Sequence, residues 1–303
     1  LSADQARRLA VGTFAGSAAL AAQSSEPPEQ LRQNVTSKGG TTHAAITTLD
    51  GVIAGFQVPQ PAHKVGATME AIGVRHSFFY TTGNPGAAVA PSPGLAGAAL
   101  TTYSGQIPFT NPGAGYTYLG RFSAAASVAG RLFLMDRLWH NSGFTMATTT
   151  AETINSAAFP ARDKAASTNG DGVQCALEVS TATTNAGAIT NTTMSYTDQS
   201  GNAGNTATIT SFPATAVAGT FVPFQLAAGD TGVRSVQTLT KGTSYGGGTM
   251  HLVCYREIAA LPLPIANTGA VCDAITCGFP RLFDNTVPFL VWLPAATTAV
   301  TVT

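Results

Sequence analysis

Hydrophobic and polar residues alternate with a period of two through much of the second half of the chain. Residues 172–184 place apolar side chains at every other position, namely Val173, Cys175, Leu177 and Val179, with polar or small residues between them. Successive side chains of a β-strand point to opposite faces of its sheet. The pattern therefore predicts a strand with one face packed on a core.

Similar patterns follow at short intervals and predict further strands. Residues 191–212 contain two Thr-rich alternating arms around the turn-forming cluster 198–205, which indicates a β-hairpin. Other strands are predicted at residues 130–139, 219–227, 233–240, 248–259 and 287–295. The glycine-rich segment 241–249 is expected to form a hairpin turn. Seven or eight strands with short turns are typical of a mainly β fold, an antiparallel β-sandwich or jelly roll.

The first part of the chain has a different character. Ser2 and Gln5 form a helix capping box, and the Pro pair at 27–28 suits the first turn of a second helix. Residues 51–120 are punctuated by Pro and Gly, which disfavour long helices. We therefore expect three parts: a helical segment at 1–50, a Pro/Gly-rich extended arm at 51–120 and a β-sandwich at 121–303.

The helical segment resembles part of a known enzyme. LSADQARRLAVGTFAGSAALAAQSSEPPEQLRQNVTSKGGTTHAAITTLD is similar to the C-terminal dimerisation region of pyrroline-5-carboxylate reductase, an NAD(P)H-dependent enzyme of proline synthesis. Its VTSKGGTT is close to that family's substrate loop. The resemblance implies that the residues holding the substrate carboxylate would be Ser37, Gly39, Gly40, Thr41 and Thr42.

Backbone N–H groups at a helix N-terminus suit such an anion. The sequence nevertheless contains no G-x-G-x-x-G nucleotide-binding pattern after a strand. We therefore interpret the segment as a remnant without catalysis, and we expect the chain to need no cofactor.

The remainder of the chain resembles a second family. From about residue 47 to the end, words such as LWHNSGFTMATTTAETINS, FPARDKAASTNGDGV and GFPRLFDNTVPFLVWLPAATTAVTVT are similar to a family of tailed-bacteriophage virion proteins carried among head genes. This resemblance implies a structural role in the virion and no catalytic residues.

Charge is scarce, which narrows the class of partner. Fifteen basic and fifteen acidic residues leave no net charge, and only 10% of the residues are charged, against about 25% in a typical soluble domain. The chain therefore has no electrostatic attraction for nucleic acid or anionic lipid, and no apolar run is long enough to span a membrane. The predicted edge strands nearly lack Lys, which indicates edges covered by other subunits.

Candidate chemistry is sparse. The five histidines form no metal-binding pair, and no G-x-S-x-G motif occurs, so we expect neither a metal site nor an enzyme. The four cysteines are interpreted as buried free thiols, with one or two disulfides as the alternative. Asp136 with Arg137, and Arg281 with Asp284, are interpreted as local ion pairs.

These observations favour a structural virion protein, a capsid cement or decoration protein or another head-associated protein. Its expected partners are copies of itself, the major capsid protein or neighbouring head proteins. The interface candidates are Tyr103, Phe109, Tyr116, Tyr118, Phe289 and Trp292, with a place in the core as the alternative. Two other functions stay open: an adhesive or receptor-binding module of a phage particle, and a fragment related to the reductase.

Overall fold

The computed structural model describes residues 24–25, 60–66, 69 and 71–303. The chain divides into two compact units, Leu1–Val58 and Pro59–Thr303, and the description below concerns the second. The predicted helical segment at 1–50 lies almost wholly outside the described residues and stays a prediction. Across the described ranges, no helix is long and apolar enough to cross a membrane.

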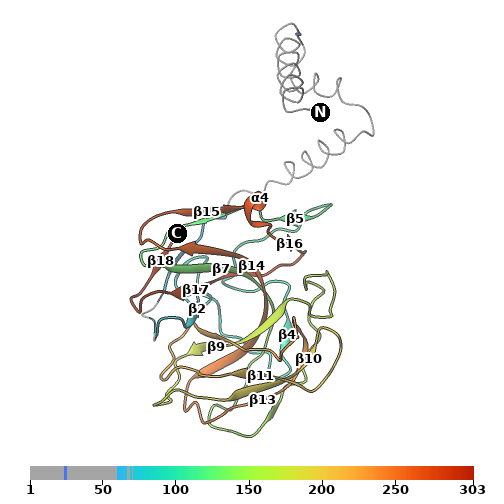
Figure 1. Ribbon diagram of the computed structural model, residues 1–303, viewed down its shortest axis with the longest axis vertical. Helices are drawn as coiled ribbons and strands as arrows, with labels where there is room; N and C mark the ends of the chain where they lie inside the picture. The colour runs from blue at the N-terminus through green and yellow to red at the C-terminus, as the bar shows by residue number, and fades with distance from the viewer. Residues whose placement is uncertain (1–23, 26–59, 67–68, 70) are drawn as a thin grey trace, which may run out of the picture. The chain divides into compact units, whose positions relative to one another are not determined.

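A closed antiparallel β-barrel forms the body of this unit. Its six strands follow the order β14, β9, β12, β2, β17 and β7, and β7 pairs back onto β14. Their bounds are Arg75–Ser77 for β2, Gly130–His140 for β7, Val173–Thr181 for β9, Thr220–Pro223 for β12, Thr249–Leu263 for β14 and Pro288–Pro294 for β17. A short strand, β4 at Ala98–Ala99, adds to β7. Figure 1 shows the long strands β7 and β14 side by side across the unit.

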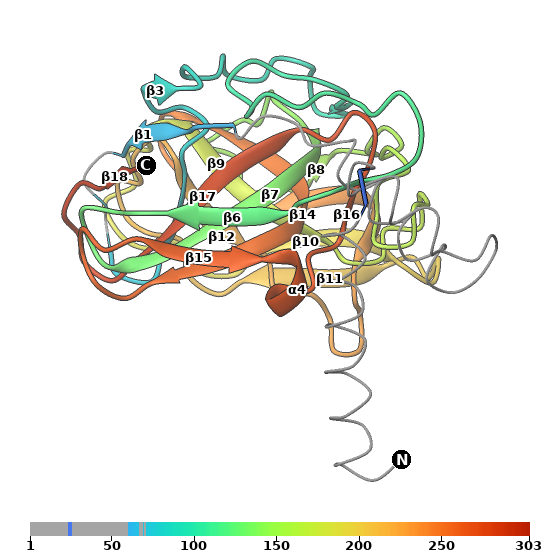
Figure 2. The same cartoon turned by 90° about the horizontal axis from the view of Figure 1, so that it is seen from above.

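Smaller sheets surround the barrel (Figure 2). A four-stranded sheet has the order β11 (Asn205–Ile209), β10 (Thr192–Asp198), β13 (Val233–Thr240) and β8 (Glu152–Thr153). A three-stranded sheet contains β18 (Thr301–Val302), β1 (His63–Val65) and β3 (Gly83–Asn84). Two ribbons pair β15 (Ala270–Asp273) with β6 (Arg121–Ala124), and β16 (Arg281–Leu282) with β5 (Thr117–Tyr118). One short helix, α4 at Ala274–Cys277, follows β15 within the described part of the chain.

Strand β9 shows how the alternating sequence builds two cores. Cys175 and Leu177 point outward and join the four-stranded sheet in one hydrophobic cluster, which also contains Met194. Ala176 lies on the opposite face, where it packs with Phe221 and other aromatic residues of the barrel interior. The predicted alternation is therefore confirmed, and both faces of the strand are buried because the barrel is covered on the outside.

Strand β7 contributes side chains to two hydrophobic clusters on the outside of the barrel. Leu132 and Leu134 in its first half pack in a cluster with Val302 of the three-stranded sheet. Leu138 and Trp139 in its second half belong to the cluster beneath the four-stranded sheet. A β-bulge separates the halves, because β14 pairs with Trp139 and next with Arg137 and skips Leu138.

The sequence predicted the fold class and most of these strands. The mainly β, antiparallel sandwich-like fold is confirmed, as are the hairpin of β10 and β11 and the barrel strands other than β2, which the sequence pattern did not predict. The prediction of a hairpin turn at 241–249 is wrong, because β13 lies in the four-stranded sheet and β14 in the barrel. This segment instead crosses between layers, and Gly248 fits there because its backbone φ is +94° and a Cβ would lie 2.3 Å from the Ala182 carbonyl oxygen.

The described part of residues 51–120 belongs to the same compact unit as the sandwich. It is largely irregular, as its Pro and Gly content predicts, but β2 occupies the barrel position between β12 and β17. Phe78 and Phe79, directly after β2, are fully buried in two different clusters. This part of the segment is thus held to the barrel by backbone pairing and by core side chains.

Candidate interaction surface

Four large hydrophobic side chains are exposed on adjoining segments of the chain. Tyr116 is 67% exposed, Tyr118 54%, Val271 56% and Ile275 96%. The segments meet because the backbone N–H of Ala274 donates to the carbonyl oxygen of residue 120, two residues after β5, at 3.0 Å. We call these four residues the α4 surface.

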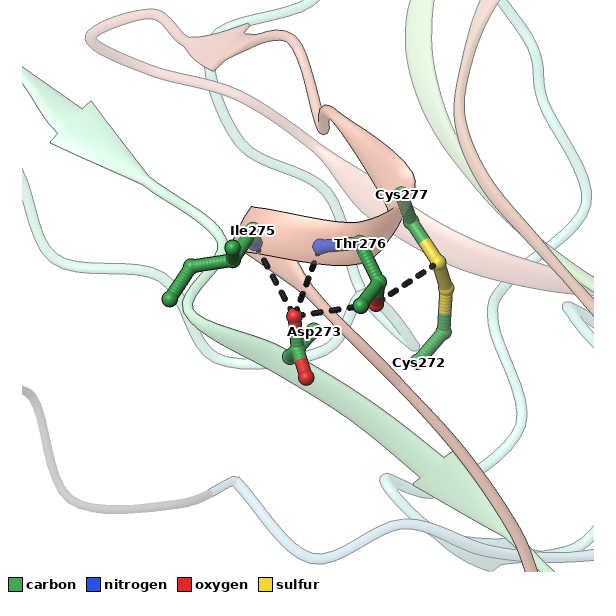
Figure 3. The surroundings of a disulfide bond; sticks show 5 residues. All are labelled: Cys272, Asp273, Ile275, Thr276 and Cys277. Carbon is green, nitrogen blue, oxygen red and sulfur yellow. Dashed lines mark hydrogen bonds between the residues drawn. A yellow bond between two sulfur atoms is a disulfide. The ribbon is translucent and has the colours of Figure 1, made fainter. Parts of the chain in front are cut away.

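Helix α4 is one turn long and is fixed at both ends by capping. The Asp273 carboxylate accepts hydrogen bonds from the backbone N–H groups of Ile275 at 3.0 Å and Thr276 at 2.8 Å, as Figure 3 shows. At the other end Gly278 adopts the left-handed conformation, and its N–H donates to the Ala274 carbonyl. The bonds from Thr276 are the main reason that the pKa of Asp273 lies below its usual range. These caps hold a helix that would be marginal by its length alone.

A disulfide between Cys272 and Cys277 closes the same turn, with a Cα–Cα distance of 6.2 Å. The free-thiol interpretation is therefore wrong for this pair, because the capped turn brings two cysteines five residues apart within bonding reach. The Ile275 side chain points away from the disulfide in Figure 3. The covalent closure and the caps hold the backbone from which this side chain projects.

The tyrosines of the α4 surface are supported by Arg281. Its guanidinium lies 3.8 Å from the ring centroid of Tyr116, within the range of a cation–π contact. Arg281 also pairs with Tyr118 in the β5–β16 ladder. Across the neighbouring ribbon Arg121 stands opposite Asp273. The surface therefore combines apolar side chains with charges of both signs.

The structure separates the interface candidates predicted from the sequence. Tyr116 and Tyr118 lie on the α4 surface. Tyr103 is half-buried, with its ring 5.7 Å from that of Phe79 and 4.7 Å from that of His140, and Phe109 is half-buried against a core cluster. The two candidates of the tail, Phe289 and Trp292, are core residues, 1% and 0% exposed, because β17 lies inside the barrel sheet with both faces covered.

Sequence reasoning missed Val271 and Ile275. The signal available was the short word CDAITCG, in which two cysteines bracket an Asp cap and a Gly stop. The reductase-like loop residues, Ser37, Gly39, Gly40, Thr41 and Thr42, lie outside the described residues.

A polar cavity of about 300 Å³ lies elsewhere on the unit. It is lined by Thr101, Thr102, Gln106, Phe109, Thr110, Asn111, Asn285 and Thr286. Two hydrogen bonds join its sides: Asn111 Nδ2 donates to Asn285 Oδ1 at 2.8 Å, and the Asn285 N–H donates to Asn111 Oδ1 at 2.7 Å. The lining is polar and uncharged, with one aromatic side chain.

The barrel interior contains buried charged side chains as well as aromatic ones. Arg137 Nη2 donates to Glu178 Oε2 at 2.6 Å, and both side chains are completely buried. Tyr80 donates its hydroxyl to the same oxygen at 2.9 Å, and the Arg137 guanidinium stacks 4.4 Å from the Phe79 ring centroid. Burial alone would raise the pKa of Glu178, but the charge of Arg137 holds it below its usual range.

The neighbouring Asp136 binds a different partner. Arg162 donates to both of its carboxylate oxygens, at 3.0 and 3.1 Å. The predicted ion pair between Asp136 and Arg137 is therefore wrong, because adjacent residues of a strand point to opposite faces. In the described part of the chain, no cluster of His, Cys, Asp and Glu could hold a metal ion.

Comparisons with known proteins match the beginning of the chain most clearly. A family model described as pyrroline-5-carboxylate reductase dimerisation matches residues 1–57, which confirms the resemblance seen in the sequence of that segment. No curated protein matches the chain significantly.

Among solved structures, one titled "Structure of infectious bursal disease virus Gt strain" is 13% identical, with a TM-score of 0.19. The alignment covers 65% of this chain and 45% of that one, so the chain spans less than half of its length. A TM-score this low carries no argument about fold or function.

Proposed function

We propose that this chain is a structural virion protein, of the capsid cement or decoration type, which acts through contacts with neighbouring head subunits. The observation that carries the proposal is Ile275, 96% exposed on a turn that is closed by a disulfide and capped at both ends. Contiguous exposed apolar groups mark interaction sites. The resemblance of residues 47–303 to tailed-phage head proteins supports the virion as the setting.

The energy of such a contact would come from burial. Fully burying an isoleucine contributes about 1.5–3 kcal/mol, and the aromatic rings of Tyr116 and Tyr118 add further apolar area. Because caps and a disulfide already fix the backbone of the turn, little loop entropy is lost on binding. The absence of net charge fits a surface that meets copies of itself or other subunits without repulsion.

The proposal is tested on purified particles from the source. Peptide mass spectrometry should find peptides of residues 138–281 in stoichiometric amounts. The purified protein should also cosediment with particles that lack it. Ile275→Asp should weaken this binding at least tenfold, whereas Val89→Asp, at an exposed aliphatic residue outside the α4 surface, should bind like the unchanged protein. A protein absent from particles, or full binding by Ile275→Asp, would overturn the proposal.

A second candidate function, receptor binding, is favoured by the polar cavity beside Phe109. Uncharged hydroxyl and amide groups around one aromatic ring suit a neutral sugar. Saturation-transfer NMR with a panel of neutral oligosaccharides should detect binding that Phe109→Ala abolishes. No transfer to any sugar of the panel would remove this candidate.

The third candidate rests on the family match at residues 1–57. A fragment related to the reductase predicts NADPH binding when the chain is mixed with a nucleotide-binding domain of that family. A mixture that binds no more NADPH than the domain alone would end it.

A further inference from the structure

Two cysteines lie side by side on adjacent strands of the barrel wall. Cys175 of β9 and Cys254 of β14 are direct partners in the strand register. Both are completely buried and are free thiols in this structure, and their Sγ atoms are 2.7 Å apart. Unbonded carbon atoms are in optimal contact at about 3.5–4.0 Å, and sulfur is larger than carbon. The two sulfur atoms are therefore closer than an unbonded contact allows.

The strand geometry also suits a covalent bond. The carbonyl oxygen of Cys175 accepts from the N–H of Phe224 at 2.9 Å, on the side of β12. Its backbone polar groups therefore point away from β14, and Cys175 and Cys254 form a non-hydrogen-bonded pair. The Cα atoms of such a pair are about 4.5 Å apart, inside the range that a disulfide spans.

We infer that Cys175 and Cys254 form a second disulfide bond, buried in the core and distinct from the Cys272–Cys277 bridge, in which Cys277 is exposed and Cys272 half-buried. The oxidant is a small disulfide of the glutathione class. The Cys175 thiolate attacks it and releases one thiol, and the Cys254 thiolate then attacks the mixed disulfide and releases the second thiol. The two cysteines give up two protons and two electrons, and the small disulfide is reduced to two thiols.

This exchange takes place before the barrel closes. Both sulfur atoms are fully buried in the folded unit, and burial raises the pKa of the Cys254 thiol well above its usual value. Once folding is complete, a small disulfide therefore cannot reach the sulfur atoms, and the thiol of Cys254 stays protonated. For the same reason, the finished bond is sheltered from reductants in solution.

The bond has a clear place in the topology. It joins residues separated by 79 positions, and the enclosed segment contains β10, β11, β12 and β13. Three of these strands form most of the four-stranded sheet. The disulfide thus links the two barrel strands, β9 and β14, between which the chain leaves the barrel to form this sheet.

The test uses the full chain, purified with an alkylating reagent present from lysis and then digested. The expected result is a peptide containing Cys175 linked to one containing Cys254. Under native conditions a mild reductant should open the Cys272–Cys277 bridge, whereas the core bridge should open only after a denaturant is added. Cys272 and Cys277 therefore control for the action of the reductant within the same molecule.

A second measurement separates the inference from the redox history of the preparation. The reduced, unfolded chain is refolded with a mixture of oxidised and reduced glutathione. Formation of the 175–254 link would support the inference even if the isolated protein were reduced. A refolded barrel that contains the 272–277 bridge and keeps two core thiols, alkylated only in denaturant, would overturn it.

Discussion

Removal of the negative charge inside the barrel should strongly destabilise the protein. In Glu178→Gln, Arg137 stays completely buried but loses the carboxylate that lies 2.6 Å from its Nη2 atom. Removing one partner of a buried ion pair typically costs about 3–5 kcal/mol, because the other charge is left uncompensated. The remaining contacts of the guanidinium include the rings of Phe79 at 4.4 Å and Phe289 at 5.6 Å and His140 Nδ1 at 3.2 Å.

The cation–π contact with Phe79 still stabilises the guanidinium by about 0.5–2 kcal/mol. The expected loss in the free energy of unfolding therefore lies near the lower end of the range of about 3–5 kcal/mol, at about 3 kcal/mol. Guanidinium unfolding followed by tryptophan fluorescence measures it, because Trp139 and Trp292 are both fully buried and report on the core. Glu257→Gln, at an exposed position of β14, the strand between β7 and β9, should change stability by less than about 0.5 kcal/mol.

The double variant Arg137→Met with Glu178→Leu completes the test. Replacing both members of a buried pair with apolar residues is often neutral or stabilising, so this variant should recover most of the loss seen in Glu178→Gln. A loss below about 1 kcal/mol for Glu178→Gln would refute the reasoning, since it would mean that Arg137 does not depend on this carboxylate.

Three further predictions concern other parts of the unit. Gly97→Ala should cost about 3 kcal/mol in chemical unfolding, because the backbone φ is +67° and the new Cβ would lie 2.2 Å from the Trp139 ring; Gly113→Ala, with open space around it, is the matched control, and equal stability of the two would contradict the packing described. Burial, and secondarily Arg137, lowers the pKa of His140 to about 2, while an unfolded histidine has a pKa of about 6.5. The unfolded chain therefore binds the proton first, and stability should fall as pH drops below about 6.5, by up to about 1.4 kcal/mol per pH unit for this histidine; His140→Asn should show a shallower slope in urea titrations, and an unchanged slope would count against it. Cys272→Ala with Cys277→Ala should remove about 2 kcal/mol of loop-closure entropy from the turn and speed hydrogen exchange at Ile275 and Thr276, and protection equal to that of the unchanged chain would show that the caps alone hold α4.

The alternation of apolar and polar residues predicted the long strands well, because successive side chains of a strand face opposite sides of the sheet with a period of two residues. Val173, Cys175, Leu177 and Val179 do face one core, as the alternation indicates. Closure of the barrel was not predictable, because β2 contributes only the three residues Arg75–Ser77, which carry no pattern. The ladder that completes the barrel depends on long-range pairing, and this leaves no local trace in the sequence.

The partners of charged residues and the exposure of small turns were harder to predict, because they also depend on contacts between segments far apart in the sequence. Asp136 and Arg137 are neighbours in sequence, yet their partners lie 26 and 41 residues away. Among the aromatic interface candidates, Tyr116 and Tyr118 are exposed, whereas Phe289 and Trp292 are buried by their tertiary environment, which aromatic content alone does not reveal. The exposure of Ile275 was not predicted, because the exposure of a single aliphatic residue depends on the conformation of the turn around it.

The shared use of β7 and β14 has a mechanical consequence. The register of β14 joins ten residues to β7 on one side and eight to β9 on the other, and β7 also backs both outer clusters. A load pulling along β14 meets hydrogen bonds that lie across the direction of force on both sides, and these must shear together. The closed barrel offers no terminal strand from which such a load could peel the sheet open one bond at a time.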